Sequence, residues 1–274
     1  MYDGVDITDN MAVDPSEFGQ FSVVAPVDPR LPNGGGYTVS GLYNITPAAA
    51  TRAASNVRNT ANNYGDYTRY WDGFDTSFTA RLVTGLNIQG GTSTGRLVED
   101  VCDVRGKAPE GMAAAPYGGL GGPSSLLNPY CRQVEPFSTT YKANASYLVP
   151  KVDVQVSGTF SSRPGVVLRA DAIYQANDPT ILATLGRPLA AVANVTVPLI
   201  APYQAYGDRI TQVDMRMGKI LRFGRTRSNL SLDVINLFNS NDNLAYQTLL
   251  SPTWPAPTSV LLPRIFRVNF GIDW

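Results

Sequence analysis

The residue types that most often carry enzyme chemistry are scarce in this sequence. It contains no histidine, which removes Ser-His-Asp and Cys-His catalytic triads and most zinc sites. Two groups of aspartates could bind Ca²⁺ through their carboxylate oxygens, but their spacing matches no EF-hand loop. The groups are Asp6, Asp9 and Asp14, and Asp100 with Asp103. We expect these aspartates to be solvated loop charges. The absence of histidine does not exclude enzymes built on carboxylates or lysines, but we expect the protein to be no enzyme and to hold no metal or other cofactor.

The two cysteines suggest a different chemistry. Cys102 and Cys131 both lie between about residues 96 and 135, a segment without strand periodicity. Their isolation in one segment favours a disulfide that closes its base, and a ring of this size gains roughly 3–4 kcal/mol from lost loop entropy. Such a bond implies an oxidising compartment and an external surface. The alternative is two unrelated buried thiols, since a metal pair would need histidine or further cysteine.

Composition favours strands and turns. Lys+Arg and Asp+Glu are both 22, so there is no basic excess and we expect no nucleic-acid partner. Charged residues make up 16% of the chain, below the value of about 25% usual for soluble domains. Tyrosine, phenylalanine, glycine and proline are abundant, which suits an all-β protein with many turns.

The last ten residues show strict alternation between apolar and polar side chains. This period of two predicts a β-strand with one apolar face. In a membrane β-barrel such a face points toward lipid, and aromatic residues lie at the interface. The alternative is an ordinary strand at the end of a soluble domain. The side chains predicted to face lipid are Phe266, Val268, Phe270, Ile272 and Trp274.

Seven further segments alternate in the same way, the first only weakly. They cover residues 2–11, 67–82, 86–93, 137–149, 152–161, 209–223 and 230–234. Short turns, at Val83–Gly85, Pro150–Lys151 and Gly224–Arg227, alternate with long segments. The long segments cover residues 13–64, 96–135, 163–205 and 239–258. The third of them is expected to contain a short helix near Pro179 to Leu185. A membrane barrel has short turns on one rim and long loops on the other. We therefore predict about eight antiparallel transmembrane strands with long extracellular loops.

The polar side of these strands would face the lumen of such a barrel. Alternation places a mixed set of charged and amide side chains on that side. The predicted lumen-facing set is Asp75, Arg81, Lys142, Asp153, Gln155, Asp214, Arg216 and Asp233.

The chain shows no helical membrane span and no export signal. No run of 18 apolar residues is present, so no transmembrane helix is expected. The segment Met1–Gly4 lacks the basic and apolar regions of a signal peptide. An exported barrel needs such a signal. Either the barrel interpretation is wrong or the chain begins partway through a longer protein.

Several stretches resemble the C-terminal end of TonB-dependent outer-membrane receptors. They are Arg216–Gly224, Asn229–Asn239, the aromatic terminal strand and Tyr70–Asp75, together with the Cys102–Cys131 loop. The most specific is the pattern D-x-x-N-x-F-N that begins at Asp233. The closest resemblance is to receptors with an N-terminal carboxypeptidase-regulatory-like domain, and it spans nearly the whole chain.

This resemblance implies a barrel of about 22 strands around a plug, in the bacterial outer membrane, for uptake of a bulky nutrient. It also implies three partners, namely outer-membrane lipid, the barrel-assembly machinery that binds the terminal strand, and TonB through an N-terminal part. This sequence lacks the plug, the TonB-engaging segment and about two thirds of the strands. The family's active-transport residues are therefore not carried over.

Residues 1–274 are accordingly predicted to be the C-terminal part of a larger outer-membrane barrel, with plug and signal peptide absent. A second hypothesis is a small self-contained barrel of eight strands that acts as an anchor or adhesin. A third is a soluble all-β binding protein.

Overall fold

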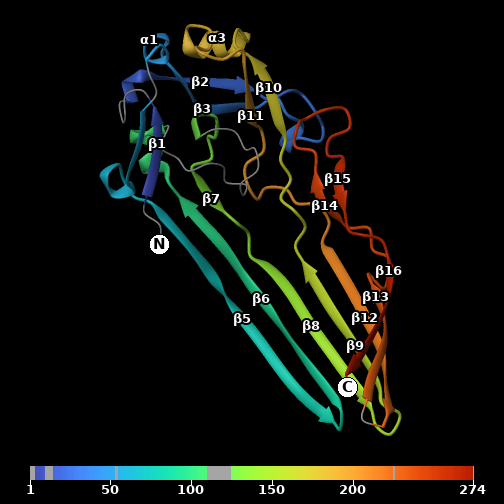
Figure 1. Ribbon diagram of the computed structural model, residues 1–274. Coiled ribbons are helices and arrows are strands. Elements are labelled where there is room, and N and C mark those ends of the chain that lie inside the picture. The colour runs from blue at the N-terminus through green and yellow to red at the C-terminus, as the bar shows by residue number, and fades with distance from the viewer. Residues whose placement is uncertain (1–3, 10–14, 53–54, 110–124, 225, 274) are drawn as a thin grey trace.

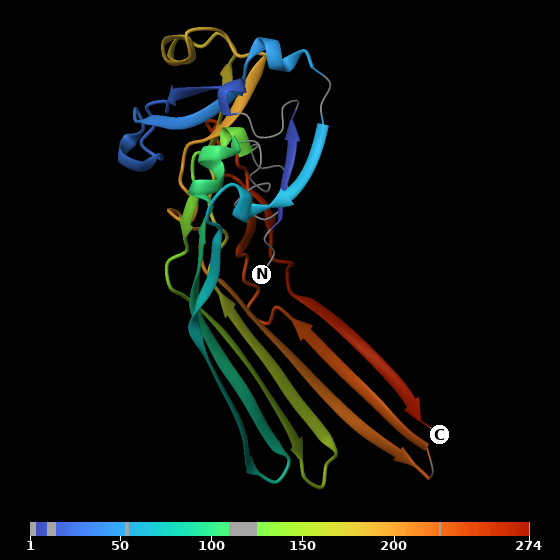
Figure 2. The same ribbon diagram turned by 90° about the vertical axis from the view of Figure 1, so that its left-hand side faces the viewer.

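A computed structural model of the chain describes residues 4–9, 15–52, 55–109, 125–224 and 226–273. These residues form two parts, which Figures 1 and 2 show one above the other. The lower part is a sheet of long strands. The upper part, called the head below, is built from the segments that connect those strands at their upper ends.

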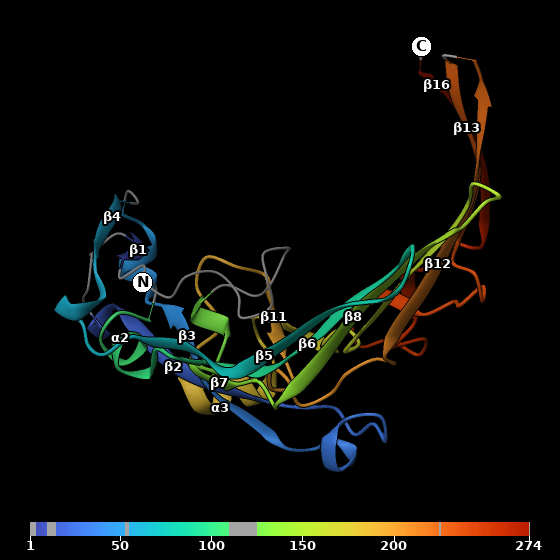
Figure 3. The same cartoon turned by 90° about the horizontal axis from the view of Figure 1, so that it is seen from below.

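The long strands form one antiparallel sheet in which each strand pairs with its neighbour in sequence. Figure 3 shows that this sheet curves strongly. The short strand β7 (Arg132–Val134) pairs with the upper end of β6. In sheet order the long strands are β5 (Thr68–Val83), β6 (Leu86–Asp100), β8 (Ser138–Val149), β9 (Val154–Arg163), β12 (Ile210–Phe223), β13 (Thr226–Ile235) and β16 (Ile265–Asp273).

The three short turns lie together at the lower end of the sheet, where the chain also ends (Figure 1). Left-handed backbone at Gly85 (φ 86°) and Gly224 (φ 61°) suits glycine, which adopts positive φ at no steric cost. The β8–β9 turn covers residues 150–153, two residues more than predicted. Asp153 has φ 51° and lies in this turn, so its predicted place in a strand is wrong.

The sheet is open in the part of the chain that the structure describes. β5 and β16 are its two edges, and they do not pair with each other. The predicted N-terminal strand exists as β1 (Gly4–Asp9), but it pairs with β4 (Ser55–Thr60) and not with the large sheet. The all-β antiparallel architecture is thus confirmed, whereas the described residues form no closed barrel.

The head contains the hydrophobic core. A hairpin of β2 (Phe18–Val24) and β3 (Thr38–Ile45) packs against α3 (Pro179–Leu185) and against the pair β10 (Asp171–Gln175) and β11 (Asn194–Pro198). The core residues come from several connecting segments, and they include Phe21, Val23, Leu42, Ile181, Val197, Leu199, Ile200 and Trp254. The long segments predicted as loops are therefore folded together.

Local capping explains why α3 forms where a short helix is predicted. The Asp178 side chain accepts a hydrogen bond from the Thr180 N–H at 2.9 Å, and Pro179 occupies the first turn. Both features favour a helix start. Gly186 ends the helix in left-handed backbone (φ 75°).

Smaller elements complete the head. They are α1 (Pro47–Ala50), α2 (Cys102–Lys107), the pair β14 (Asn243–Tyr246) and β15 (Pro257–Val260), and 3₁₀ turns at Pro15–Glu17, Pro32–Gly34, Ala61–Asn63 and Ser125–Leu127. No helix in the described residues is long and apolar enough to cross a membrane.

The predicted disulfide is present in the head. The sulfur atoms of Cys102 and Cys131 are 1.98 Å apart, and their Cα atoms are 4.9 Å apart. The bond joins the start of α2 to the residue before β7. A backbone hydrogen bond from the Val101 N–H to the Cys131 carbonyl, at 3.0 Å, lies beside it. The disulfide therefore closes the base of the segment between β6 and β7.

Candidate functional site

Strand pairing divides the large sheet into a polar face and an apolar face. On the polar face Arg216 lies opposite Asp233, and Asp233 lies opposite Arg267. On the apolar face Met217 lies opposite Leu232, and Leu232 lies opposite Val268. Because side chains alternate along a strand, these two rows define the faces for their neighbours. The candidate site is the polar face.

Asp233 is the centre of the most connected polar group on this face. Arg216 donates to both of its carboxylate oxygens, from Nε to Oδ1 at 2.5 Å and from Nη2 to Oδ2 at 2.9 Å. Arg267 donates to Oδ2 from Nε at 3.1 Å and from Nη2 at 2.9 Å. The Asn269 amide donates to the same oxygen at 3.0 Å. We call these four residues the Asp233 cluster.

The Asp233 cluster combines a covered carboxylate with open guanidinium groups. The Asp233 side chain is 6% exposed, whereas those of Arg216 and Arg267 are 51% and 57% exposed. One carboxylate thus faces two permanently charged cations. The Nη1 group of each arginine has no protein partner among the described residues. The cluster therefore offers positive charge and unused N–H donors to the space above the polar face.

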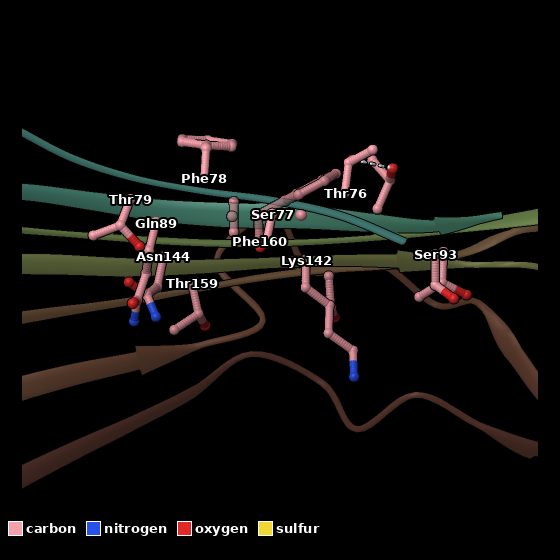
Figure 4. Close-up of a pocket in the computed structure, with 16 residues that line it drawn as sticks. Thr76, Ser77, Phe78, Thr79, Gln89, Ser93, Lys142, Asn144, Thr159 and Phe160 are labelled. Atoms are coloured by element: carbon pink, nitrogen blue, oxygen red, sulfur yellow. Dashed lines mark hydrogen bonds between the residues drawn. The ribbon is translucent and has the colours of Figure 1, made fainter. Parts of the chain in front are cut away.

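A groove of about 800 Å³ lies along the sheet; its lining includes Lys142 and other polar-face residues, and also Thr76, Phe78, Thr92 and Phe160 of the apolar face. Figure 4 shows Lys142, Gln89, Asn144 and Thr159 on one side of the sheet and Phe78 on the other. Gly91 lies opposite Lys142 on β6 and contributes no side chain. The Lys142 side chain is exposed, its ammonium has no hydrogen bond or ion pair within the described part of the chain, and in Figure 4 it points to the same side of the sheet as Gln89 and Asn144.

Hydroxyl and amide groups surround this lysine. They belong to alternate residues of four neighbouring strands, so all of them share the polar face. The polar residues that line the groove on this face are Ser77, Thr79, Gln89, Ser93, Thr140, Asn144, Thr159 and Ser161. The groove can therefore donate and accept many hydrogen bonds around one unpaired cation.

Most of the predicted lumen-facing residues lie on the polar face. Asp153 lies outside the strands, in the β8–β9 turn, where it accepts a hydrogen bond at 3.2 Å from Arg222, a polar-face residue of β12. Strand register places the others on the polar face, and they are Asp75, Arg81, Lys142, Gln155, Asp214, Arg216 and Asp233. That this face lines a lumen stays a prediction.

The structure adds two residues to the predicted set. Arg267 and Asn269 belong to the Asp233 cluster, although alternation alone only assigns them to the polar side of the last strand. Their link to Asp233 depends on the register between β13 and β16, in which Asp233 pairs with Arg267. A local sequence pattern carries no signal for that register.

The other face of the last strand is apolar and open to solvent. The Val268 and Phe270 side chains are 70% and 63% exposed, and Phe266 and Ile272 are exposed as well. Trp274 lies outside the described residues. The exposed apolar surface continues across the sheet through Leu230, Leu232, Met217, Phe160, Phe78 and Phe74. A large exposed apolar surface of this kind is typical of a contact site for another protein, a membrane or a ligand.

The head contains a separate charged group beside its core. Arg30 donates to both oxygens of Asp28, and its guanidinium lies 5.8 Å from the centre of the Trp254 ring. The same arginine donates to the carbonyl oxygens of Pro252 and Trp254. The side-chain hydrogen bonds from Arg30 lower the pKa of Asp28 from 3.8 to about 2. This group ties the β2–β3 hairpin to residues 252–254.

The described residues contain no group of three His, Cys, Asp or Glu side chains that could hold a metal ion. Asp100 is occupied by local contacts, since it accepts from the Cys102 N–H at 3.1 Å and lies 3.5 Å from Arg132. The described residues of the polar face offer hydrogen-bond donors, hydrogen-bond acceptors and fixed positive charge.

Comparison with known proteins leaves the family open. No protein-family model matches the chain, and no match was found among curated proteins.

Proposed function

We propose that this chain is the C-terminal part of the barrel of a TonB-dependent outer-membrane receptor that takes up a bulky nutrient. The observation that carries the proposal is the exposed apolar face of the large sheet. Within the described residues no second layer covers the apolar face of this sheet, and phenylalanine, leucine and valine side chains are exposed along it. In a bilayer the lipid would cover that face, and the polar face would line an aqueous lumen.

The two ends of the sheet also support the proposal, because they differ as the two rims of an outer-membrane barrel do. Its lower end has short turns only, as the periplasmic rim of such a barrel does. Its upper end carries the whole folded head (Figure 1), in the place where extracellular loops would extend. The disulfide Cys102–Cys131 lies in the head, which accords with an oxidising external compartment.

The unpaired edges support a larger barrel over a small self-contained one. A sheet edge in a bilayer leaves backbone N–H and C=O groups without partners, which is costly in hydrocarbon. Closing seven strands on themselves would require β5 to pair with β16, and these strands lie at opposite edges of the sheet. Further strands between β5 and β16 would provide hydrogen-bond partners for the backbone groups of both edges. The family's active-transport residues are not assigned to this chain.

A pair of substitutions on β16 tests the proposal. Arginine at mid-depth on a lipid-facing strand position costs about 2–4 kcal/mol. Phe270→Arg should therefore reduce insertion strongly, whereas Asn269→Arg, on the polar face, should be tolerated far better. The measurement is the amount of heat-modifiable barrel in outer-membrane fractions of cells that express the gene encoding this chain. A deletion of Trp274 should also block insertion, if this residue completes the signal for the assembly machinery.

The control is the comparison between the two arginine variants. Both add the same side chain to adjacent positions of one strand. Equal tolerance of Phe270→Arg and Asn269→Arg would mean that β16 has no lipid-facing side, and the proposed membrane function would then be wrong.

A further inference from the structure

We propose that the polar face binds anionic groups of the cargo, such as phosphate, sulfate or carboxylate groups, at two separate places, one at Arg216 with Arg267 and the other at Lys142. This inference deepens the proposed function, on which it rests, by naming a class of cargo. The polar face carries an excess of basic residues, although the chain as a whole has a net charge of zero.

Basic residues outnumber acidic ones on the polar face of the long strands between residues 68 and 272. The basic set is Arg69, Arg81, Lys142, Arg163, Arg216, Arg222, Arg227 and Arg267, and the acidic set is Asp75, Glu99, Asp214 and Asp233. Arg222 is in addition paired with Asp153 of the β8–β9 turn at 3.2 Å, and the basic excess remains when Asp153 is counted. Because the chain as a whole is neutral, this excess is a property of one surface. A surface lined by one sign of charge attracts ligands of the opposite sign.

The Asp233 cluster gives this positive charge a fixed geometry. Asp233 engages the Nε and Nη2 edge of both arginines. Each guanidinium is thereby held in place, while its Nη1 group points to no protein acceptor within the described residues. One carboxylate neutralises only one of the two cations. Each guanidinium thus keeps an unused Nη1 donor for an anion while Asp233 stays bound, and guanidinium groups suit phosphate and carboxylate oxygens well.

Lys142 supplies a second, separate cation. Its ammonium is exposed and has no partner among the described residues, and the groove around it carries hydroxyl and amide groups. These groups suit a cargo that is polar as well as charged. Asp214 lies between Lys142 and the cluster in the strand register, but it already accepts from Gln212 at 2.8 Å and from the Asn236 N–H at 2.8 Å. Its charge is thus partly satisfied by these two donors.

Calorimetric titration of the complete chain, folded in detergent micelles, tests the inference with defined probes. Inorganic tripolyphosphate and citrate represent phosphate and carboxylate anions, and spermidine is the cationic control. We expect at least one of the two anions to bind, with an affinity that falls as salt rises, and we expect spermidine not to bind. Equal binding of spermidine, or no binding of either anion at low salt, would overturn the inference.

Substitutions locate the site. Arg216→Gln, Arg267→Gln and Lys142→Gln should each weaken anion binding by about two- to fivefold, as expected for one exposed charge, and Arg216→Lys should retain most of it. The matched control is Lys219→Gln. Lys219 lies on β12, as Arg216 does, but on the apolar face, since it pairs with Leu230. An equal loss for Lys219→Gln would show that the anion does not bind at the polar face. If the arginine variants fail to fold, the loss of anion binding in Lys142→Gln alone tests the inference, because Lys142 has no hydrogen bond or ion pair within the described residues whose loss could destabilise the sheet.

The outcomes separate this inference from the proposed function. If Phe270→Arg blocks membrane insertion and anions do not bind, only the class of cargo is wrong. If anions bind as expected but Phe270→Arg and Asn269→Arg insert equally, the membrane function is wrong and an anion-binding sheet remains.

Discussion

The Arg267 guanidinium lies 2.9 Å from the carboxylate of Asp233, a residue 34 positions earlier in the chain. This contact joins the last strand to its neighbour on the polar face, and Arg216 reaches the same carboxylate from the next strand. Three strands are thus connected through one covered acidic side chain.

Asp233→Asn should destabilise the sheet, because it leaves two guanidinium groups close together without the charge that offsets their repulsion. We expect the thermal unfolding midpoint in detergent to fall by several degrees. Part of the loss should be recovered on raising the salt concentration, since salt screens repulsion between exposed charges. Circular dichroism during heating at two salt concentrations measures both effects.

Asp75→Asn is the control for this prediction. Asp75 lies on the same face, and within the described residues it has no hydrogen bond or ion pair. Its substitution should leave the midpoint nearly unchanged. A similar loss in both variants, or a loss in Asp233→Asn that salt does not alter, would contradict a stabilising role for the Asp233 cluster.

The disulfide should stabilise the head. A bond that spans 29 positions is expected to contribute about 3–4 kcal/mol through restriction of the unfolded chain. Mass spectrometry of the unreduced protein after alkylation should find no modified cysteine. Chemical unfolding of the Cys102→Ala, Cys131→Ala double variant should show the lost stability. Two alkylated cysteines in the native protein would contradict the prediction.

Helix α3 offers a test of the core of the head. Ile181 is fully buried, whereas its neighbour Leu182 is 38% exposed. Ile181→Ala should cost about 2–5 kcal/mol, the range for large apolar side chains removed from a core. Leu182→Ala, on the same helix, should cost clearly less. Urea unfolding followed by tryptophan fluorescence, to which Trp254 in the core of the head contributes, compares the two variants. Equal costs would contradict the position of the core in the structure.

Stability of the head should depend on pH through Asp28. Its pKa is 3.8 when unpaired and about 2 when folded. A carboxyl group with a lowered folded pKa contributes stability that is present above pH 3.8 and is lost as pH falls toward 2. The difference in unfolding midpoint between wild type and Asp28→Asn should therefore shrink over that range.

Arg30→Gln supplies the control for this pH dependence. It removes the side-chain donors that are the main cause of the lowered pKa of Asp28, so most of the same pH-dependent stability should disappear. A wild-type advantage over Asp28→Asn that stays constant from pH 6 to pH 2 would mean that the ion pair does not contribute in this way.

The sequence by itself determined the features that depend on neighbouring residues. Alternation along segments such as 138–149 and 265–273 predicts the long strands and their two faces, because successive side chains of a strand point to opposite sides. Gly85 and Gly224 mark turns through their backbone freedom, and Asp178, Pro179 and Gly186 mark the ends of α3. The pairing of the only two cysteines is also confirmed.

Only the tertiary structure decided how distant segments combine. The strands of the head are short, and its core joins residues as far apart as Phe21 and Trp254, so no single segment shows the pattern of a folded unit. The same holds for Asp153, whose place depends on the length of the β8–β9 turn, and for the pairing of β1 with β4. Contacts such as Asp233 with Arg267 depend on strand register, which is set by pairing across the sheet and not by the period of one strand.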